Sequence, residues 1–305
     1  MTAESVIAVS GLRKLYGEMA AVDGVSFDVQ RGEIFGLIGP NGSGKTTTVE
    51  CLQGLRTIDG GHAEVLGLDP TTEGAKLRHL IGSQLQESAL PDRIRVWEAL
   101  DLFSAMTPHG VPWQGLVEEW DLLDKKDAAF ASLSGGQRQR LFIALSLVNN
   151  PRVVFLDEMT TGLDPAARRM AWDLVRKVRD RGATVVLVTH FMDEAEHLCD
   201  RIAVFRGGRI RAIDSPGNLI HEFGTGAVVK FTAPDATPLP FLAGIPGVSE
   251  VRQDGAAWTL EGKGAILAHT GAALVTNGLE PLDLRVERPT LEDVFLRLTT
   301  EEDHE

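Results

Sequence analysis

The chain has 305 residues, of which 30 are Lys or Arg and 43 are Asp or Glu, so its formal net charge is −13. This length allows one large domain with a sizeable core and one small domain. The sequence has no Lys/Arg run that would supply a basic face for nucleic acid, and an acidic protein has no general attraction to anionic lipid. Its apolar runs are far shorter than the roughly 20 residues that span a bilayer, and the N-terminus does not resemble a signal peptide. We therefore expect a cytoplasmic protein with no nucleic-acid partner, which reaches membranes through another protein.

The first two thirds of the chain alternate short apolar strands with helices, a pattern typical of a parallel sheet with helical crossovers. Strands are expected at 5–9, 25–29, 34–38, 153–156 and 185–188. Helices are expected at 46–53 and 166–180, within a helix-rich stretch over 97–130, and directly after Gln137. Glycines that bound or split the alternating runs predict β-hairpins at 60–67 and 203–212.

The character of the sequence changes near Gly224, and a proline-rich connection lies at 232–248. Around this connection the patterns predict strands at 228–231, 248–253, 257–261 and 282–286. Helices are expected at 265–277 and from about 290 to 298. These elements indicate a small α+β module after the larger α/β domain. Cys51 and Cys199 lie in apolar contexts and are predicted to be reduced, buried thiols.

A glycine-rich loop follows the expected strand at 34–38. Its sequence, GPNGSGKT, matches the phosphate-binding pattern G-x-x-x-x-G-K-[ST]. Glycines let backbone N–H groups approach a polyanion, and the helix that starts near Lys45 adds its positive end. Lys45 is expected to reach the β- and γ-phosphates of a nucleotide, and the Thr46 hydroxyl to bind Mg²⁺. The residues predicted to hold the nucleotide here are Gly39, Pro40, Asn41, Gly42, Ser43, Gly44, Lys45, Thr46 and Thr47.

An acidic pair ends the apolar run VVFLDE, which fits a Walker B strand. Asp157 comes directly after apolar residues, and a buried carboxylate needs a partner if it is to stay charged. A Mg²⁺ ion held through water provides such a partner, so Asp157 is predicted to belong to the metal site with Thr46. Together with the phosphate loop, this strand indicates a P-loop nucleotide hydrolase that uses Mg²⁺.

A second glycine-rich helix start lies between these two motifs, in the sequence LSGGQ. Ser134 can cap the following helix, while Gly135 and Gly136 expose backbone N–H groups to an anion. One nucleotide cannot use both helix starts within one subunit, because a long helical segment separates them. The three motifs, in this order, resemble the ATP-binding subunit of an ABC transporter.

This resemblance covers residues 4 to about 220 and, more weakly, the remainder of the chain. It implies a P-loop NTPase fold with a mixed sheet in an ABC ATP-binding domain at 1–222, including a helical subdomain at about 88–150, and an accessory domain at 223–305. It also implies that two copies sandwich two nucleotides. Each copy then completes the site of the other through Ser134, Gly135, Gly136 and Gln137, and Asp164 resembles the D-loop residue at that interface.

The resemblance assigns roles to further residues. Glu158 is expected to polarise the attacking water, and His190, which ends VVLVTH, to contact the γ-phosphate. Gln86 resembles the Q-loop glutamine that senses Mg²⁺ and the transmembrane partner, although Gln84 is a rival for that place. Tyr16 matches the aromatic residue that stacks on adenine. The predicted catalytic set is therefore Lys45, Gln86, Glu158 and His190, and the predicted metal set is Thr46, Gln86 and Asp157.

Several of these residues also fit ordinary structural roles. His190 fits a satisfied core histidine at a strand end, and Tyr16 fits simple packing. One group of residues has the types found in metal sites, namely His190, Asp193, Glu194, His197 and Cys199. A solvated amphipathic helix explains the acids of this group better. Met159 stands where the family usually has proline, which removes a backbone constraint but no catalytic group.

The phosphate-loop region and the segment RPTLEDVFLRLT near the C-terminus resemble ATPases of the daunorubicin-resistance type of multidrug exporter. This implies that ATP hydrolysis drives an ABC-2-type permease on a separate chain, which holds the pocket for a drug, lipid or polymer. The ATPase would then lie on the inner face of the cell membrane. The apolar face of the last helix fits either core packing or a subunit contact, and its residues are Leu291, Val294, Phe295 and Leu298.

Two other classes of function remain as alternatives. A soluble ABC ATPase acting on ribosomes or DNA usually has two ABC modules or a long coiled-coil insertion, whereas this chain has one module and a short interval between Gln86 and Leu133. A nucleotide-gated binding module without turnover would lack Glu158 or His190, and both are present.

Overall fold

The computed structural model describes residues 4–84, 89–108, 110–224, 226–233, 239–281, 283–287 and 289–300. It separates the chain into two compact units, Met1–Pro216 and Gly217–Glu305. The predicted combination of a larger α/β region and a small α+β region is confirmed. The functional boundary placed at residue 222 remains a prediction.

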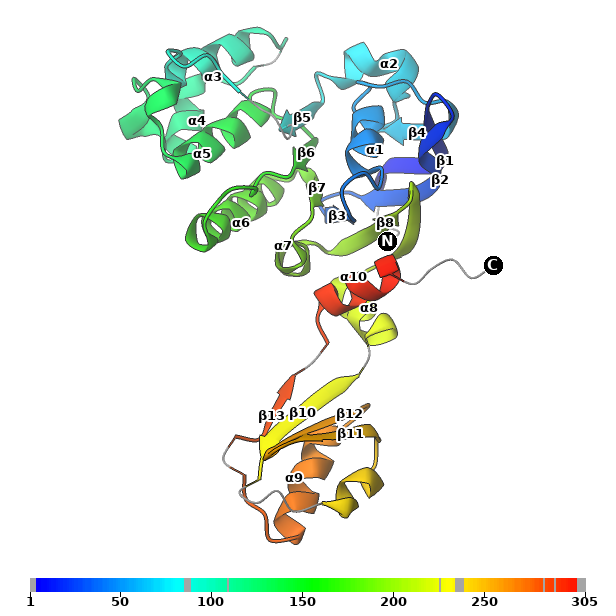
Figure 1. Ribbon diagram of the computed structural model, residues 1–305. Coiled ribbons are helices and arrows are strands. Elements are labelled where there is room, and N and C mark those ends of the chain that lie inside the picture. The colour runs from blue at the N-terminus through cyan, green and yellow to red at the C-terminus, as the bar shows by residue number, and fades with distance from the viewer. Residues whose placement is uncertain are drawn as a thin grey trace. The chain divides into compact units, whose positions relative to one another are not determined.

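A six-stranded sheet forms the centre of the first unit (Figure 1). Its order is β5 (Ile81–Gln84), β6 (Val153–Asp157), β7 (Thr184–Thr189), β3 (Ile34–Ile38), β8 (Arg201–Arg206) and β9 (Arg209–Asp214). The strands run parallel from β5 to β8, and β9 is antiparallel to β8, which confirms the predicted hairpin there. Since β3, β6 and β7 are parallel neighbours, the residues that follow them gather at one edge of the sheet.

A smaller antiparallel sheet has the order β2 (Met19–Gln30), β1 (Ser5–Tyr16) and β4 (Gly60–Val65). One core cluster combines residues of both sheets with α1 (Lys45–Leu52), and the rings of Phe27 and Phe35 stack 5.3 Å apart within it. The hairpin predicted at 60–67 is wrong, because β4 is a single strand that pairs with β1. Its buried Ala63 and Val65 join the shared core, so this alternation belongs to one strand.

The remaining helices of the first unit are α2 (Pro70–Leu77), α3 (Val96–Ala105), α4 (Trp113–Glu119), α5 (Gly135–Ser146), α6 (Pro165–Asp180) and α7 (Met192–Leu198), with short 3-10 helices at Leu123–Lys125 and Phe130–Ser132. In Figure 1, α3, α4 and α5 lie together, away from α1. No helix within the described residues combines the length and the apolar character needed to cross a membrane. Cys51 and Cys199 are both free and buried, as predicted.

The second unit has a four-stranded antiparallel sheet in the order β11 (Val248–Asp254), β12 (Ala257–Gly262), β10 (Ala227–Thr232) and β13 (Arg285–Glu287). Its helices are α8 (Pro216–Phe223), α9 (Ile266–Thr276) and α10 (Leu291–Thr300), with a 3-10 helix at Pro240–Gly244. Phe231 and Trp258 stack in a core of its own, and α9 adds Ile266 and Leu274 to that core. In α10, Leu291 and Val294 are buried and Leu296 is exposed.

Candidate nucleotide site

The phosphate loop runs from the end of β3 to the start of α1, and its backbone leaves no room for side chains at two positions. A Cβ atom on Gly39 would lie 2.6 Å from the Phe205 carbonyl oxygen, and one on Gly44 would lie 2.3 Å from the Ala21 carbonyl oxygen. Gly44 also has a φ of 100°, and no side chain caps the helix that starts there. The N–H groups at the start of α1 therefore suit an anionic ligand.

Lys45 is the buried cation of this loop. Its Nζ donates to the carbonyl oxygens of Gly39 at 2.8 Å and Pro40 at 2.9 Å. Burial lowers the pKa of Lys45, and the nearby carboxylates of Glu158 and Asp157 partly oppose that effect. The ammonium group thus lies inside the loop, as a residue that contacts phosphate must.

Asp157 ends β6 and is only 2% exposed. Burial raises its pKa to about 6, although a hydrogen bond from the Thr46 side chain acts in the opposite direction. Among the residues that the structure describes, nothing donates a hydrogen bond to Asp157 Oδ1. A buried carboxylate oxygen without a donor, beside a threonine hydroxyl, fits the oxygen ligands that Mg²⁺ prefers.

Glu158 and His190, which follow neighbouring strands β6 and β7, are brought together. The Nδ1 atom of His190 lies 3.3 Å from Glu158 Oε1. Glu158 has a φ of 49°, in the left-handed region that residues other than glycine rarely adopt, and its backbone N–H donates to the Val188 carbonyl oxygen at 2.9 Å. Strained backbone of this kind is common at functional sites. The geometry therefore fits the paired catalytic roles predicted for these two residues.

The second glycine-rich helix start, at α5, is capped by its own side chains. Ser134 Oγ accepts from the Gln137 backbone N–H at 3.3 Å, and Gln137 Oε1 accepts from the Ser134 backbone N–H at 3.0 Å. Ser134 and Gly135 are exposed. The helix start is therefore held by its own reciprocal cap, and its first residues are exposed.

Two other predicted ligand residues have clear local surroundings. Asp164 caps α6, because its Oδ1 accepts from the backbone N–H groups of Ala166 and Ala167, each at 2.9 Å. Tyr16 is 40% exposed at the end of β1, and the Arg56 guanidinium lies 5.5 Å from its ring centre. These contacts leave their nucleotide roles as predictions.

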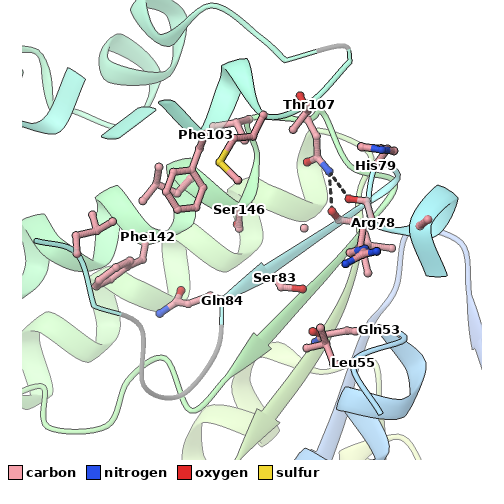
Figure 2. Close-up of a pocket in the computed structure, with 18 of the residues that line it drawn as sticks. Gln53, Leu55, Arg78, His79, Ser83, Gln84, Phe103, Thr107, Phe142 and Ser146 are labelled. Carbon is pink, nitrogen blue, oxygen red and sulfur yellow. Dashed lines mark hydrogen bonds between the residues drawn. The ribbon is translucent and has the colours of Figure 1, made fainter. Parts of the chain in front are cut away.

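A groove of about 750 Å³ lies beside β5 and between α1 and the helices α3 and α5. Figure 2 shows Phe103 and Phe142 with Gln84 and Gln53 around it. Gln84 is buried and accepts from Gln139 Nε2 at 3.1 Å, whereas Gln86 lies outside the described residues. Both polar atoms of the Gln53 amide are buried without a partner in the described part of the chain.

The acids of α7 are not all solvated, contrary to the sequence-based interpretation. Asp193 and Glu196 are exposed, but Glu194 is completely buried. The helical spacing in the sequence could have indicated the burial of Glu194, because this residue lies four residues before Leu198 and next to Ala195, which are both buried. No three His, Cys, Asp or Glu residues form a candidate metal site among the residues described.

Comparisons with known proteins identify the family. Residues 22–161 match the family model described as ABC transporter. The chain is 38% identical to Nod factor export ATP-binding protein I of Ralstonia nicotianae, covering 97% of this chain and 94% of that relative. It belongs to the ABC transporter family of ATP-binding proteins. A daunorubicin resistance ATP-binding protein of Streptomyces coeruleorubidus is 37% identical, covering 97% of this chain and 96% of that protein.

Solved structures of the family agree with this assignment. The ATP-binding subunit of an ABC transporter matches with a TM-score of 0.64 and 25% identity, covering 72% of this chain and 93% of that chain. A dimeric ATP-binding cassette in a post-hydrolysis state with ADP and phosphate matches with a TM-score of 0.62 and 25% identity, covering 68% of this chain and 98% of that one. The predicted family and ATPase activity are confirmed, whereas the roles of single residues remain predictions.

Proposed function

We propose that this ABC ATPase drives export through a separately encoded ABC-2-type permease, and that two copies close on two ATP molecules during each cycle. The observation that carries the proposal is the convergence of the phosphate loop, Asp157 and the Glu158–His190 pair at one edge of the sheet. Relatives named for export and for drug resistance favour this function over a soluble ABC ATPase acting on ribosomes or DNA.

In this proposal, each group of the phosphate loop has a separate task. The backbone N–H groups at the start of α1 bind the phosphates, and Lys45 exchanges its carbonyl contacts for the β- and γ-phosphates. Thr46 and Asp157 would hold Mg²⁺, which supplies positive charge beside the phosphates when bound. Tyr16 stacks on adenine through its exposed ring.

Hydrolysis uses the pair at the ends of β6 and β7. The Glu158 carboxylate orients a water molecule, whose oxygen attacks the γ-phosphorus while the bond to the β–γ bridging oxygen breaks. The products are ADP and inorganic phosphate. His190 contacts the γ-phosphate and holds it near Glu158, since its ring lies within 3.3 Å of that carboxylate.

The second copy completes each site. Its exposed Ser134 and Gly135 bring the α5 start to the γ-phosphate, where the capped helix end meets the anion. Asp164 lies at the start of α6 and contacts the partner copy near the same place. Because each site uses both copies, hydrolysis requires the dimer to close on ATP that each copy has already bound.

The groove beside β5 is the proposed docking place for a helical segment of the permease (Figure 2). Its apolar rim includes Met106, which is 70% exposed, and the unpartnered Gln53 amide offers a hydrogen bond to an incoming chain. Gln84, also in this groove, pairs with Leu156, the residue before Asp157. A docked segment therefore lies one strand away from the nucleotide site and holds the ATPase on the inner face of the membrane.

Purification from detergent-solubilised membranes tests the partnership. The tagged wild-type protein should recover a chain with several membrane-spanning segments, encoded separately. Met106→Glu should lose that chain, because it puts a charge on the apolar rim, and should keep the ATPase activity of the isolated protein. Leu123→Glu is the matched control, since Leu123 is 48% exposed and does not line the groove. Equal recovery by both variants would contradict docking in the groove, and recovery of no membrane chain by the wild type would contradict the proposed function.

A further inference from the structure

Glu194 is a fully buried carboxylate that none of the proposed catalytic steps uses. Carboxylates are rarely buried unless they have partners, because the charged form loses its hydration. Here the Trp172 indole donates from α6 to Glu194 Oε1 at 3.2 Å. Burial raises the pKa of Glu194, and the hydrogen bond from the Trp172 indole partly opposes that effect. The other carboxylate oxygen, Oε2, has no hydrogen-bond partner among the described residues.

The hydrogen-bond partner of Glu194 lies on α6, the helix that Asp164 caps. Glu194 itself belongs to α7, which begins two residues after His190. This hydrogen bond therefore ties the helix that follows His190 to α6.

A second contact joins α6 to the same region. The Arg168 guanidinium lies 3.8 Å from the centre of the Phe191 ring and 3.4 Å from Asp193 Oδ2. Phe191 follows His190, and their rings lie 4.1 Å apart. The residue that follows His190 thus contacts α6 directly.

We infer that Glu194 is a positioning residue for ATP hydrolysis, which fixes His190 relative to α6 through the hydrogen bond that Glu194 accepts from Trp172. It touches neither nucleotide nor water in this scheme and acts only through that contact. The effect can be large, because an error of about 1 Å between reacting groups can reduce a rate by about 100-fold. The inference rests on the roles proposed above for Glu158 and His190.

Four variants of the full-length protein test this inference by steady-state ATP hydrolysis. Glu194→Ala removes the acceptor and should lower kcat by roughly tenfold or more while KM for ATP changes by less than about twofold. Glu194→Gln keeps an oxygen acceptor for Trp172 and should retain most of kcat. Trp172→Phe removes only the indole donor and should lower kcat by a few fold. Glu196→Ala is the control, because it removes an exposed carboxylate of the same helix.

The outcomes separate positioning from simple stability. A kcat within twofold of wild type for both Glu194→Ala and Trp172→Phe would overturn the inference, and so would a Glu194→Gln variant as slow as Glu194→Ala. Should Glu194→Ala fail to fold, kcat of Trp172→Phe decides the matter alone. Glu158→Gln and His190→Ala are assayed in parallel: if these two variants stay active, the proposed catalytic roles are at fault rather than the positioning role of Glu194.

Discussion

The starts of α1 and α5 both follow glycine-rich sequences, but their surroundings differ. At α1 no side chain caps the helix, and buried groups nearby have no hydrogen-bond partner in the described part of the protein, namely Ser43 Oγ and Asp157 Oδ1. At α5, Ser134 and Gln137 cap one another and Gly135 is exposed. The first helix start is incomplete without a ligand in the same chain, whereas the second is complete and able to meet a ligand that another copy carries.

The largest expected effect comes from a change that leaves both helix starts intact. Glu158→Gln removes the carboxylate that orients water, so steady-state ATP hydrolysis should fall by about 100- to 1000-fold. ATP affinity should remain close to that of the wild type, and a nucleotide-bound dimer should accumulate in size-exclusion chromatography. Hydrolysis within about threefold of wild type would remove Glu158 from this role.

Ser134→Arg breaks only the second helix start. A monomer should still bind ATP almost normally, because the phosphate loop is untouched. The bulky side chain blocks the place where the γ-phosphate docks, so ATP-driven dimerisation should disappear and turnover should fall on the order of 100-fold. Light scattering and an ATPase assay check the two effects. Full activity of the isolated variant would contradict the shared site.

Mixing this variant with Lys45→Ala protein tests the sharing directly. In a two-fold sandwich, the mixed dimer has one site with both changes and one site with neither. Partial ATPase activity should therefore return when two nearly inactive proteins are combined. Activity that stays at the level of the separate variants, although mixed dimers form, would mean that the sites are not shared or that one intact site cannot act alone.

Much of the α1 site could be predicted from the sequence because its residues are adjacent in the chain. The loop from Gly39 to Thr46 follows a fully buried strand, and Asp157 ends another, so strand order alone brings them to one edge. His190 was predicted in the same way, from the end of β7. Contacts that depend on packing between distant segments were not predictable, and the β1–β4 pairing and the Glu194–Trp172 hydrogen bond belong to this class.

Glu194 also shows why residue type alone was misleading. Acidic residues on a short helix are usually solvated, and this holds for Asp193 and Glu196. Glu194 lies on the buried face, where the Trp172 indole offsets part of its lost hydration. The sequence contains both residues, but nothing in their spacing relates Trp172 to Glu194 before the helices are packed.

Lys45→Ala breaks the first helix start and should weaken ATP binding. Hydrogen bonds to a charged group contribute about 1.5–3 kcal/mol, so the loss should be roughly 10- to 100-fold in affinity. Thermal unfolding with and without Mg-ATP measures it, since a bound ligand raises the apparent midpoint. Lys76→Ala is a suitable control, because its exposed ammonium pairs with Glu73 away from the loop. An equal ATP-induced rise for Lys45→Ala and wild type, at subsaturating nucleotide, would show that the loop has been misassigned.

The smallest effect concerns the buried carboxylate that makes the first helix start incomplete. Burial raises the pKa of Asp157 from its ordinary value of 3.8 to about 6. This group therefore stabilises the fold below about pH 3.8, and that contribution is lost as pH rises through about 6. A rise of this size, in which the attraction to Lys45 is already included, corresponds to at most about 3 kcal/mol.

Ligand-free Asp157→Asn should thus unfold a few degrees higher than wild type at pH 7.5 and show little difference at pH 4, where both side chains are mostly neutral. Mg-ATP should raise its midpoint less than that of the wild type, because the metal site has lost its charge. Asp101→Asn, at an exposed position of α3, controls for the loss of one negative charge. A ligand-free Asp157→Asn protein less stable than wild type at pH 7.5 would mean that the carboxylate already has a stabilising partner, and the contrast between the two helix starts would fail.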